Sequence, residues 1–178
     1  KEKRLALLHV VIIGGGPPGD EMAAETAELF FDTMPRYYPA DILRDMRITL
    51  VQRMDTLLPG FDPRVQKVSL DVLEKKGVTV LRNTAVEKIE NTDVYLNTGN
   101  ILHTHLPLWV AGIEANTISS DTQTEKNPKQ CLFIEKNMRL KNLDDVFVIG
   151  DMSYCEGQPF PALAQVATQQ GHAVAKNV

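Results

Sequence analysis

Short apolar blocks alternate with helix-like patterns through the first part of the chain. Leu7 to Ile13 is a continuous apolar run of strand length that ends at three glycines, which is typical of a strand buried on both faces. From Pro17 to Asp32, apolar residues recur near the helical period, and proline occupies the opening turn, where no amide donor is needed. We therefore expect a strand, a glycine turn and a helix in succession.

The same alternation resumes after residues 34–45, which contain two prolines and which we interpret as an insertion. Arg47 to Val51 predicts a second strand because β-branched and apolar residues dominate it. Asp62 to Lys76 predicts an amphipathic helix that ends at Gly77, and residues 78–81 predict a third strand. Strands that alternate with helices indicate an α/β fold with a doubly wound parallel sheet.

The second half of the chain has a different pattern. Short alternating segments over residues 85–112 predict a small antiparallel meander and then a returning strand. Asn116 to Gln130 is polar and predicts a loop, Val146 to Ile149 predicts a last short strand, and a helix is expected from Pro161 onward. We divide the chain into a first domain, a connector and part of a second domain, over residues 1–115, 116–145 and 146–178.

Composition excludes several classes of function. The formal charge of −4 and the scattered Lys and Arg residues give no basic stripe, so nucleic acid is not an expected partner. The longest apolar runs, Leu5 to Ile13 and Ile101 to Val110, are far shorter than the roughly 20 residues that a membrane helix needs. Cys131 and Cys155 stand far apart without a CxxC motif, which favours inert thiols.

Gly14, Gly16 and Gly19 form the pattern G-x-G-x-x-G between the first predicted strand and the first predicted helix. In this context the glycines allow a tight turn, a close approach of backbone to a pyrophosphate, and close packing of helix on strand. The phosphates would lie at the helix N-terminus, where free amides and the helix dipole favour anions. We therefore predict a Rossmann-like dinucleotide site that also includes Gly15 and Pro17 of the same turn.

A dinucleotide site of this kind places an acidic residue at the end of the second strand to bind the adenosine ribose. Here the strand ends in Gln52 and Arg53 instead. A neutral side chain removes the repulsion of a 2′-phosphate, and an arginine can bind that phosphate, so NADPH as well as NADH is expected as ligand. The alternative is an ordinary surface strand end without contact to a ligand.

Two histidines, His103 and His105, alternate along a predicted strand. No third ligand with suitable spacing accompanies them, so no metal site is predicted.

The order of several segments resembles type II NADH dehydrogenases, especially the eukaryotic kind, within the pyridine nucleotide-disulfide oxidoreductase superfamily. The resemblance covers nearly the whole chain and rests on the segments LLHVVIIGGGPPGDEMAAE, YYP, ITLVQRMDTLLPGFD, WVAG, VFVIGD and PALAQVATQQG. It implies a flavoprotein that passes a hydride from NAD(P)H to FAD and then electrons to a quinone. It also implies that the first domain binds NAD(P) and that the last segment belongs to an FAD-binding domain.

The resemblance assigns roles to individual residues. Glu21 matches a glutamate near the nicotinamide and the flavin ring, and Asp151, which follows Gly150, matches an aspartate that reaches the flavin. The WVAG segment adds Ala111 and Gly112 to the cofactor-binding set. Gln165 and Gln169 match the two glutamines of a quinone motif, and on a helix residues four apart lie on one face.

Other implications concern the parent enzyme and its surroundings. Such enzymes are peripheral proteins of the mitochondrial inner membrane, and a homodimer is expected. Their first flavin motif and their membrane-anchoring part would lie outside these residues, so this chain alone is expected to bind a dinucleotide without holding FAD tightly. A non-catalytic dinucleotide-binding module and a relative of soluble FAD-dependent disulfide reductases remain the alternatives.

Two positions depart from the family pattern. Pro18 stands where the family has Thr, and Asp20 stands where it has an aliphatic residue. A carboxylate in the first helical turn suits the helix dipole but does not favour a nearby pyrophosphate.

Overall fold

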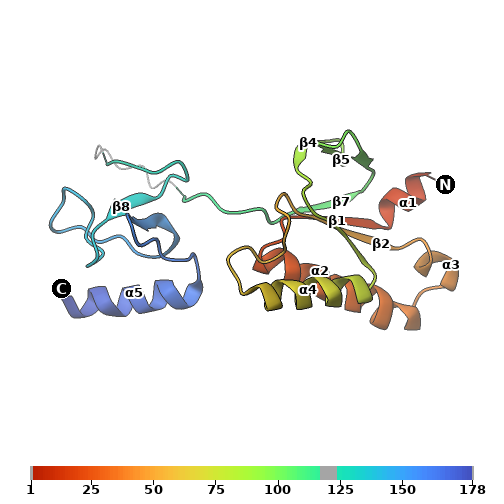
Figure 1. Cartoon of the computed structure of the whole chain (residues 1–178), viewed down its shortest axis with the longest axis horizontal. Coiled ribbons are helices and arrows are strands. Elements are labelled where there is room, and N and C mark those ends of the chain that lie inside the picture. Colours follow the sequence, from red (N-terminus) through yellow and green to blue (C-terminus); the bar gives the residue numbers. More distant parts are fainter. Residues whose placement is uncertain (1, 117–123, 178) are drawn as a thin grey trace. The chain divides into compact units, whose positions relative to one another are not determined.

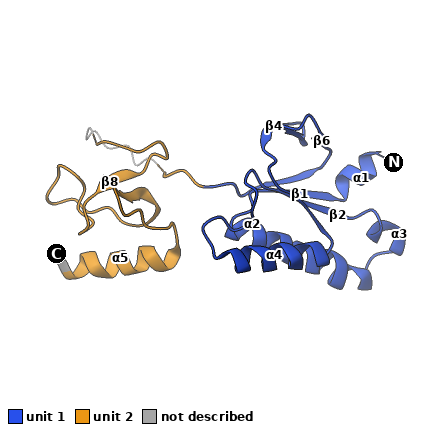
Figure 2. Cartoon of the chain, in the orientation of Figure 1, with its two compact units in different colours: residues 1–112 blue, residues 113–178 orange. Residues whose placement is uncertain are grey.

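The computed structural model describes residues 2–116 and 124–177. The chain divides into two compact units, residues 1–112 and residues 113–178 (Figure 2).

The first unit is built on a four-stranded parallel sheet with the order β3-β2-β1-β7 (Figure 1). Its strands are β1 (His9–Ile13), β2 (Arg47–Val51), β3 (Val78–Leu81) and β7 (Leu106–Trp109). A smaller antiparallel sheet follows β3 and contains β4 (Val86–Glu90), β5 (Asp93–Leu96) and β6 (Ile101–Leu102). The sequence prediction of an α/β fold with a parallel sheet and an antiparallel meander is therefore confirmed.

The parallel sheet lies between the helices and the antiparallel sheet, and alternate residues of β1 face one or the other. Val10 and Ile12 face the helices α2 (Pro17–Ala27) and α4 (Pro63–Lys75), and all of these elements share one buried cluster. Val11 and Ile13 face the antiparallel sheet and pack with its Val94. Because both faces of β1 are covered, its five residues are all buried, which explains the apolar run from Val10 to Ile13.

β7 forms one edge of the parallel sheet and carries Pro107 opposite Val11. The amide of Val110 donates to the Ile13 carbonyl at 2.9 Å. Because successive residues of a strand turn their amides to opposite sides, the nitrogen of Pro107 faces away from β1. Proline is tolerated there because this nitrogen has no strand to bond.

One local prediction for the first unit was wrong, and the structure adds detail to two others. Residues 7 and 8 do not belong to the first strand, because a short helix α1 (Glu2–Leu7) precedes β1. The regular helix α2 ends at Ala27, and a π-type segment continues over Glu28–Thr33. The insertion contains a 3₁₀ turn, Met34–Arg36, and a short helix α3 (Ala40–Leu43).

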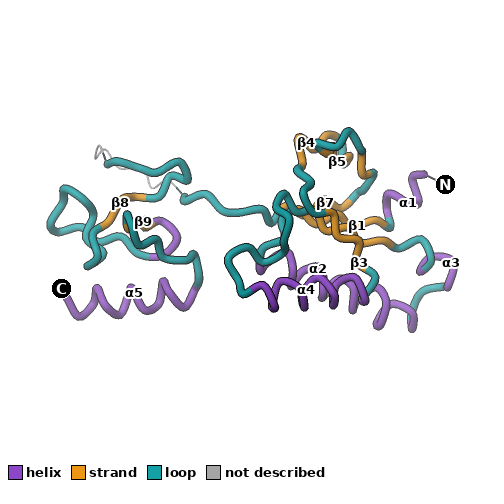
Figure 3. The backbone as a smooth tube through the Cα atoms, viewed as in Figure 1, coloured by secondary structure: helices purple, strands orange, loops and turns teal. Residues whose placement is uncertain are grey.

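The second unit is mostly loop around a pair of short strands and one helix (Figure 3). The strands β8 (Leu132–Ile134) and β9 (Ser153–Cys155) pair in parallel, and α5 (Ala164–Asn177) packs against them through Ala173 and Val174. The predicted helix from Pro161 onward is confirmed, with its first residue at Ala164.

The strand predicted at Val146 to Ile149 was wrong. This segment pairs with residues 138–140 through two backbone hydrogen bonds and a single bridge from Phe147 to Arg139, which does not amount to a strand. A 3₁₀ turn, Gly150–Met152, follows it. Part of the predicted loop at 116–130 lies outside the described residues, and the region assigned to a connector contributes β8. The division at residues 115 and 145 stays a prediction.

Among the described helices, none combines the length and the apolar character that crossing a membrane requires.

Candidate functional site

The glycine turn joins β1 to α2 by backbone contacts that leave no room for side chains at two positions. Gly14 has φ +116°, and a Cβ there would lie 2.8 Å from the Cα of Ala111. A Cβ on Gly19 would lie 1.8 Å from the Gly14 carbonyl oxygen. The first glycine therefore permits the turn beside Ala111, and the third permits α2 to approach β1, as the G-x-G-x-x-G spacing predicts.

Gly16 differs from the other two glycines. Its φ is −80°, and a Cβ there would meet only the Cδ of Pro18, at 3.9 Å. The fold therefore does not require glycine at this position. A glycine that packing does not need is consistent with space reserved for a ligand.

Few amide donors point out of this turn. The Gly15 amide donates to Oε1 of Gln52 at 3.2 Å, and the Gly19 amide donates to the Gly16 carbonyl at 3.0 Å. Pro17 and Pro18 have no amide hydrogen. The Gly16 amide has no acceptor within the described part of the chain, so it is the donor that this turn offers to an anion.

Gln52 lies directly after β2 and is buried, with 6% of its surface exposed. Its Oε1 accepts from the Gly15 amide, and its Nε2 donates to the Thr56 carbonyl at 2.9 Å. The Leu58 amide in turn donates to the Gly15 carbonyl at 2.7 Å. Gln52 thus ties the glycine turn to residues 53–58, and both of its amide atoms are engaged inside the protein.

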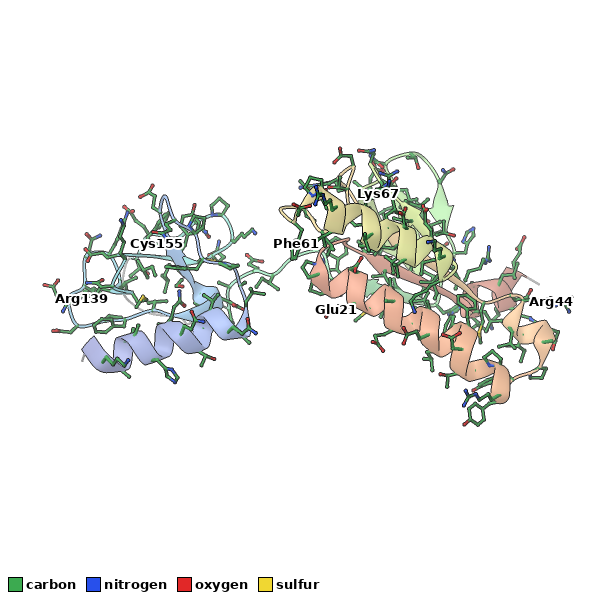
Figure 4. All side chains as sticks on the ribbon, turned by 60° about the horizontal axis from the view of Figure 1, so that its bottom comes forward. Glu21, Arg44, Phe61, Lys67, Arg139 and Cys155 are labelled. Atoms are coloured by element: carbon green, nitrogen blue, oxygen red, sulfur yellow. The ribbon has the colours of Figure 1, made fainter. Side chains whose placement is uncertain are left out.

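The N-terminal part of α2 carries the two acidic residues that the sequence singled out, Asp20 in the first turn and Glu21 directly after it. Oδ1 of Asp20 accepts a hydrogen bond from the Ser69 hydroxyl of α4, so this carboxylate is directed to the neighbouring helix. Glu21 is exposed and lies at the N-terminal end of α2 (Figure 4). The sequence analysis did not anticipate Ser69, because nothing in the local pattern pairs it with a residue 49 positions earlier.

In the second unit, Asp151 follows Gly150 in the 3₁₀ turn before β9. The Gly150 amide donates to Oε1 of Gln170 at 2.7 Å, and the Ser153 hydroxyl donates to the Gly150 carbonyl at 2.8 Å. A cavity of about 470 Å³ opens beside this turn and is lined by Gly150, Asp151, Cys131, Tyr154, Phe160 and Ala162, among others. The turn is therefore fixed from both sides and presents Asp151 to a cavity.

Three glutamines of α5 have different environments. Gln165 and Gln169 are both exposed, which agrees with their four-residue spacing along one helix face. Gln170 is buried, and its Nε2 has no acceptor among the described residues. Sequence reasoning missed Gln170, because its partner Gly150 is 20 residues away. A buried donor without a partner is rare in folded proteins, which makes Gln170 a candidate to bind a further polar group.

Three histidines, His9, His103 and His105, lie at the opposite edge of the first unit, near the amino ends of the parallel strands β1 and β7. His9 Nδ1 lies 2.9 Å from the His103 carbonyl, and its Nε2 lies 2.8 Å from the Thr49 hydroxyl. Burial is the main cause that lowers the pKa of His9, the charge of Arg47 lowers it further, and the bond to His103 opposes both.

His103 and His105 line a separate cavity of about 420 Å³, where His103 pairs with Asp93 at 2.9 Å. In the described residues, no three His, Cys, Asp or Glu side chains gather in a way that could hold a metal ion.

Comparison with known protein families shows to which family this chain belongs. The model of the pyridine nucleotide-disulphide oxidoreductase family matches residues 1–171. The chain belongs to this family.

Individual relatives also confirm the resemblance to type II NADH dehydrogenases. A probable NADH dehydrogenase of Dictyostelium discoideum is 29% identical over 98% of this chain and 39% of its own length. A mitochondrial internal alternative NAD(P)H-ubiquinone oxidoreductase A1 of Arabidopsis thaliana is 30% identical over 96% of this chain and 34% of its own length. The chain therefore spans between about a third and two fifths of the length of these curated relatives.

Solved structures of the family share the fold. NDH2 of Plasmodium falciparum in complex with NADH superposes with a TM-score of 0.78 at 23% identity, over 86% of this chain and 33% of that one. A FAD-dependent pyridine nucleotide-disulphide oxidoreductase of Desulfovibrio vulgaris gives a TM-score of 0.71 at 26% identity, over 95% and 42%.

Proposed function

We propose that the first unit binds the nicotinamide dinucleotide of a flavin-dependent NAD(P)H:quinone oxidoreductase. In this reaction NAD(P)H gives a hydride to FAD, and the electrons then pass to a quinone. The observation that carries the proposal is the glycine turn, where packing requires Gly14 and Gly19 but leaves Gly16 free for a ligand. The names of the relatives, which are NADH dehydrogenases and NAD(P)H-ubiquinone oxidoreductases, support the same reaction.

In this proposal each residue of the turn has a distinct task. The Gly16 amide donates to the pyrophosphate, and Gln52 holds the turn in shape through Gly15. Glu21, exposed at the start of α2, orients the nicotinamide, and Ala111 with Gly112 forms the wall of the site beside Gly14. The turn offers few donors because of its two prolines, so we expect modest affinity for the pyrophosphate.

The second unit would contribute to the FAD site. Asp151 at the 470 Å³ cavity and the unpartnered Nε2 of Gln170 fit a polar portion of the flavin cofactor, such as its ribityl chain. When bound, FAD supplies the hydride acceptor. The residues of this chain would only position it.

Quinone as acceptor is supported by the ubiquinone oxidoreductases among the relatives. We propose that the exposed amides of Gln165 and Gln169 bind the quinone carbonyl from one face of α5. A peripheral position at the mitochondrial inner membrane and a homodimeric parent enzyme complete the proposal. The mitochondrial names of several relatives support the compartment.

Titration of the chain with NADH, followed by the fluorescence of the reduced nicotinamide, tests the dinucleotide site. Gly16→Ala should weaken NADH binding at least about tenfold, because a methyl group would occupy the space of the phosphate. Gly171→Ala is the control, since its Cβ would make only an ordinary contact of 3.6 Å with Ile149, far from the turn in sequence. The proposal fails if wild-type protein does not bind NADH or if both variants bind it equally well.

A further inference from the structure

We propose that Arg82, together with Arg53, binds the 2′-phosphate of NADPH and is the main determinant of coenzyme choice. This inference rests on the proposed function, because it assigns the adenosine end of the same dinucleotide site. It adds a residue that follows β3, whereas the sequence pattern pointed only to residues at the end of β2.

The first step is the place of the adenosine ribose. In a sheet of this kind the dinucleotide lies outside the carboxyl ends of the strands, with the adenosine ribose beside the end of β2. β3 lies next to β2, and Val51 pairs with Leu81. The residues that follow Val51 and Leu81 therefore surround the expected position of the ribose.

These residues stay paired beyond the two strands. The Gln52 amide donates to the Leu81 carbonyl at 2.8 Å, the Thr84 amide donates to the Gln52 carbonyl at 3.0 Å, and the Asn83 amide donates to the Met54 carbonyl at 3.0 Å. Arg53 and Arg82 thus lie on adjacent backbone segments that are held together on both sides.

The side chain of Arg82 crosses to the neighbouring segment. Its Nη1 donates to the backbone carbonyl of Asp55 at 2.9 Å, two residues after Arg53. A guanidinium has five N–H donors, so this bond leaves most of them available. Arg82 is therefore held over the loop at residues 53–58 with donors free for an anion.

No acidic group neutralises either arginine within residues 2–116 and 124–177. The ion pairs of this part of the chain involve neither Arg53 nor Arg82, and Asp55 contributes only its carbonyl oxygen to Arg82. Both arginines are exposed. Two guanidiniums without an ion pair, which follow the neighbouring strands β2 and β3, match the charge of a phosphate monoester and its capacity for bidentate hydrogen bonds.

Gln52 does not compete for this role. Its amide is buried and bonds to Gly15 and Thr56, so it reaches no ligand while these bonds persist. Its contribution to NADPH binding is the absence of a negative charge beside the two arginines. The scarcity of amide donors at Pro17 and Pro18 makes this cationic end the stronger anchor for the coenzyme.

The test is a pair of titrations of the full chain, with NADPH and with NADH, at low and moderate ionic strength. Arg82→Gln should weaken NADPH binding at least about tenfold and change NADH binding by less than about twofold. Arg82→Lys retains the charge and should recover part of the NADPH affinity. Added salt should weaken NADPH binding more than NADH binding in the wild type, and this difference should shrink in Arg82→Gln.

Arg44→Gln is the matched control. Arg44 is exposed and has no carboxylate partner in the described residues. It lies at the opposite end of the first unit from Phe61, whose amide bonds to Leu58 of the loop that Arg82 contacts (Figure 4). It should leave both affinities unchanged. Comparison of the melting temperatures of Arg82→Gln and wild type checks that loss of the bond to Asp55 has not unfolded the loop at residues 53–58 or the residues that it contacts.

The possible outcomes distinguish a failure of the proposed dinucleotide site from a failure of the assignment of Arg82. If wild-type protein binds neither coenzyme, the proposed dinucleotide site is wrong. If it binds NADH but Arg82→Gln changes both affinities equally or changes neither, the site stands and the assignment of Arg82 is overturned. The same holds if Arg44→Gln weakens NADPH binding as much as Arg82→Gln does.

Discussion

Replacing Gly19 by alanine tests the close approach of α2 to β1. The new Cβ would lie 1.8 Å from the Gly14 carbonyl oxygen, whereas real Cβ atoms essentially never come within 3.0 Å of such an atom. The helix or the turn must therefore move by at least 3.0 − 1.8 = 1.2 Å. Overpacking of this kind costs up to about 3 kcal/mol, and alanine in a helix regains about 1 kcal/mol, so we expect a net loss of up to about 2 kcal/mol.

Urea unfolding of wild type, Gly19→Ala and Gly16→Ala measures this loss. Gly16→Ala is the control, because its Cβ has open space and its φ of −80° suits any residue. It should change the free energy of unfolding by less than about 1 kcal/mol. NADH titration should show weakened binding for both variants, for steric reasons at Gly16 and through displacement of the turn at Gly19. If Gly19→Ala is as stable as wild type, the deduced contact between α2 and Gly14 is wrong.

Further predictions concern five other positions. Pro18→Ala should strengthen NADH binding by roughly tenfold, because it restores an amide donor in the first turn of α2; unchanged affinity in a titration would show that this position does not face the phosphates. The folded-state pKa of His9 lies below its unfolded value of 6.5, so the unfolded state binds a proton first as the pH falls. The folded state therefore loses stability between pH 6.5 and the folded pKa and is unaffected by this group above pH 6.5. Melting temperatures measured from pH 8 to pH 5 should fall less in His9→Gln than in wild type. Gln170→Met should abolish the protection of the Gly150 amide in hydrogen exchange, whereas Gln170→Glu should retain it, because only the acceptor oxygen is needed. Equal protection in both variants would exclude the bond to Gln170 as the cause of this protection. In the parent enzyme, Gln165→Ala with Gln169→Ala should slow flavin reoxidation by quinone but not flavin reduction by NAD(P)H in stopped-flow measurements, and equal slowing of both steps would indicate a structural role.

The parts of the fold that depend on local patterns were predictable from the sequence. The continuous apolar run of β1 and the spacing of the three glycines each report a constraint that acts over a few residues. Prediction was weaker where two structures suit the same short segment. Leu7 is apolar and suits a strand, yet it ends α1. The apolar segment at Val146 to Ile149 suits a strand too, but its partner at residues 138–140 offers only one bridge.

The site was less predictable because its key bonds are long-range. The position of Gln52 at a strand end suggested a contact with ribose, whereas its amide bonds inward to Gly15, 37 residues earlier. Gln170 looks like any helical glutamine until Gly150 is placed beside it. The role proposed for Arg82 in binding the coenzyme depends on the pairing of β2 with β3, which the sequence pattern alone does not specify.

Pro107 also determines how the protein can associate with other molecules. An exposed parallel strand can recruit a strand from a second molecule, since its free amides and carbonyls form a template for continued pairing. At β7 that template is interrupted where the proline nitrogen faces outward, so a strand docked along this edge would leave a carbonyl without a donor. Extending the sheet of the first unit from molecule to molecule is therefore disfavoured at this edge.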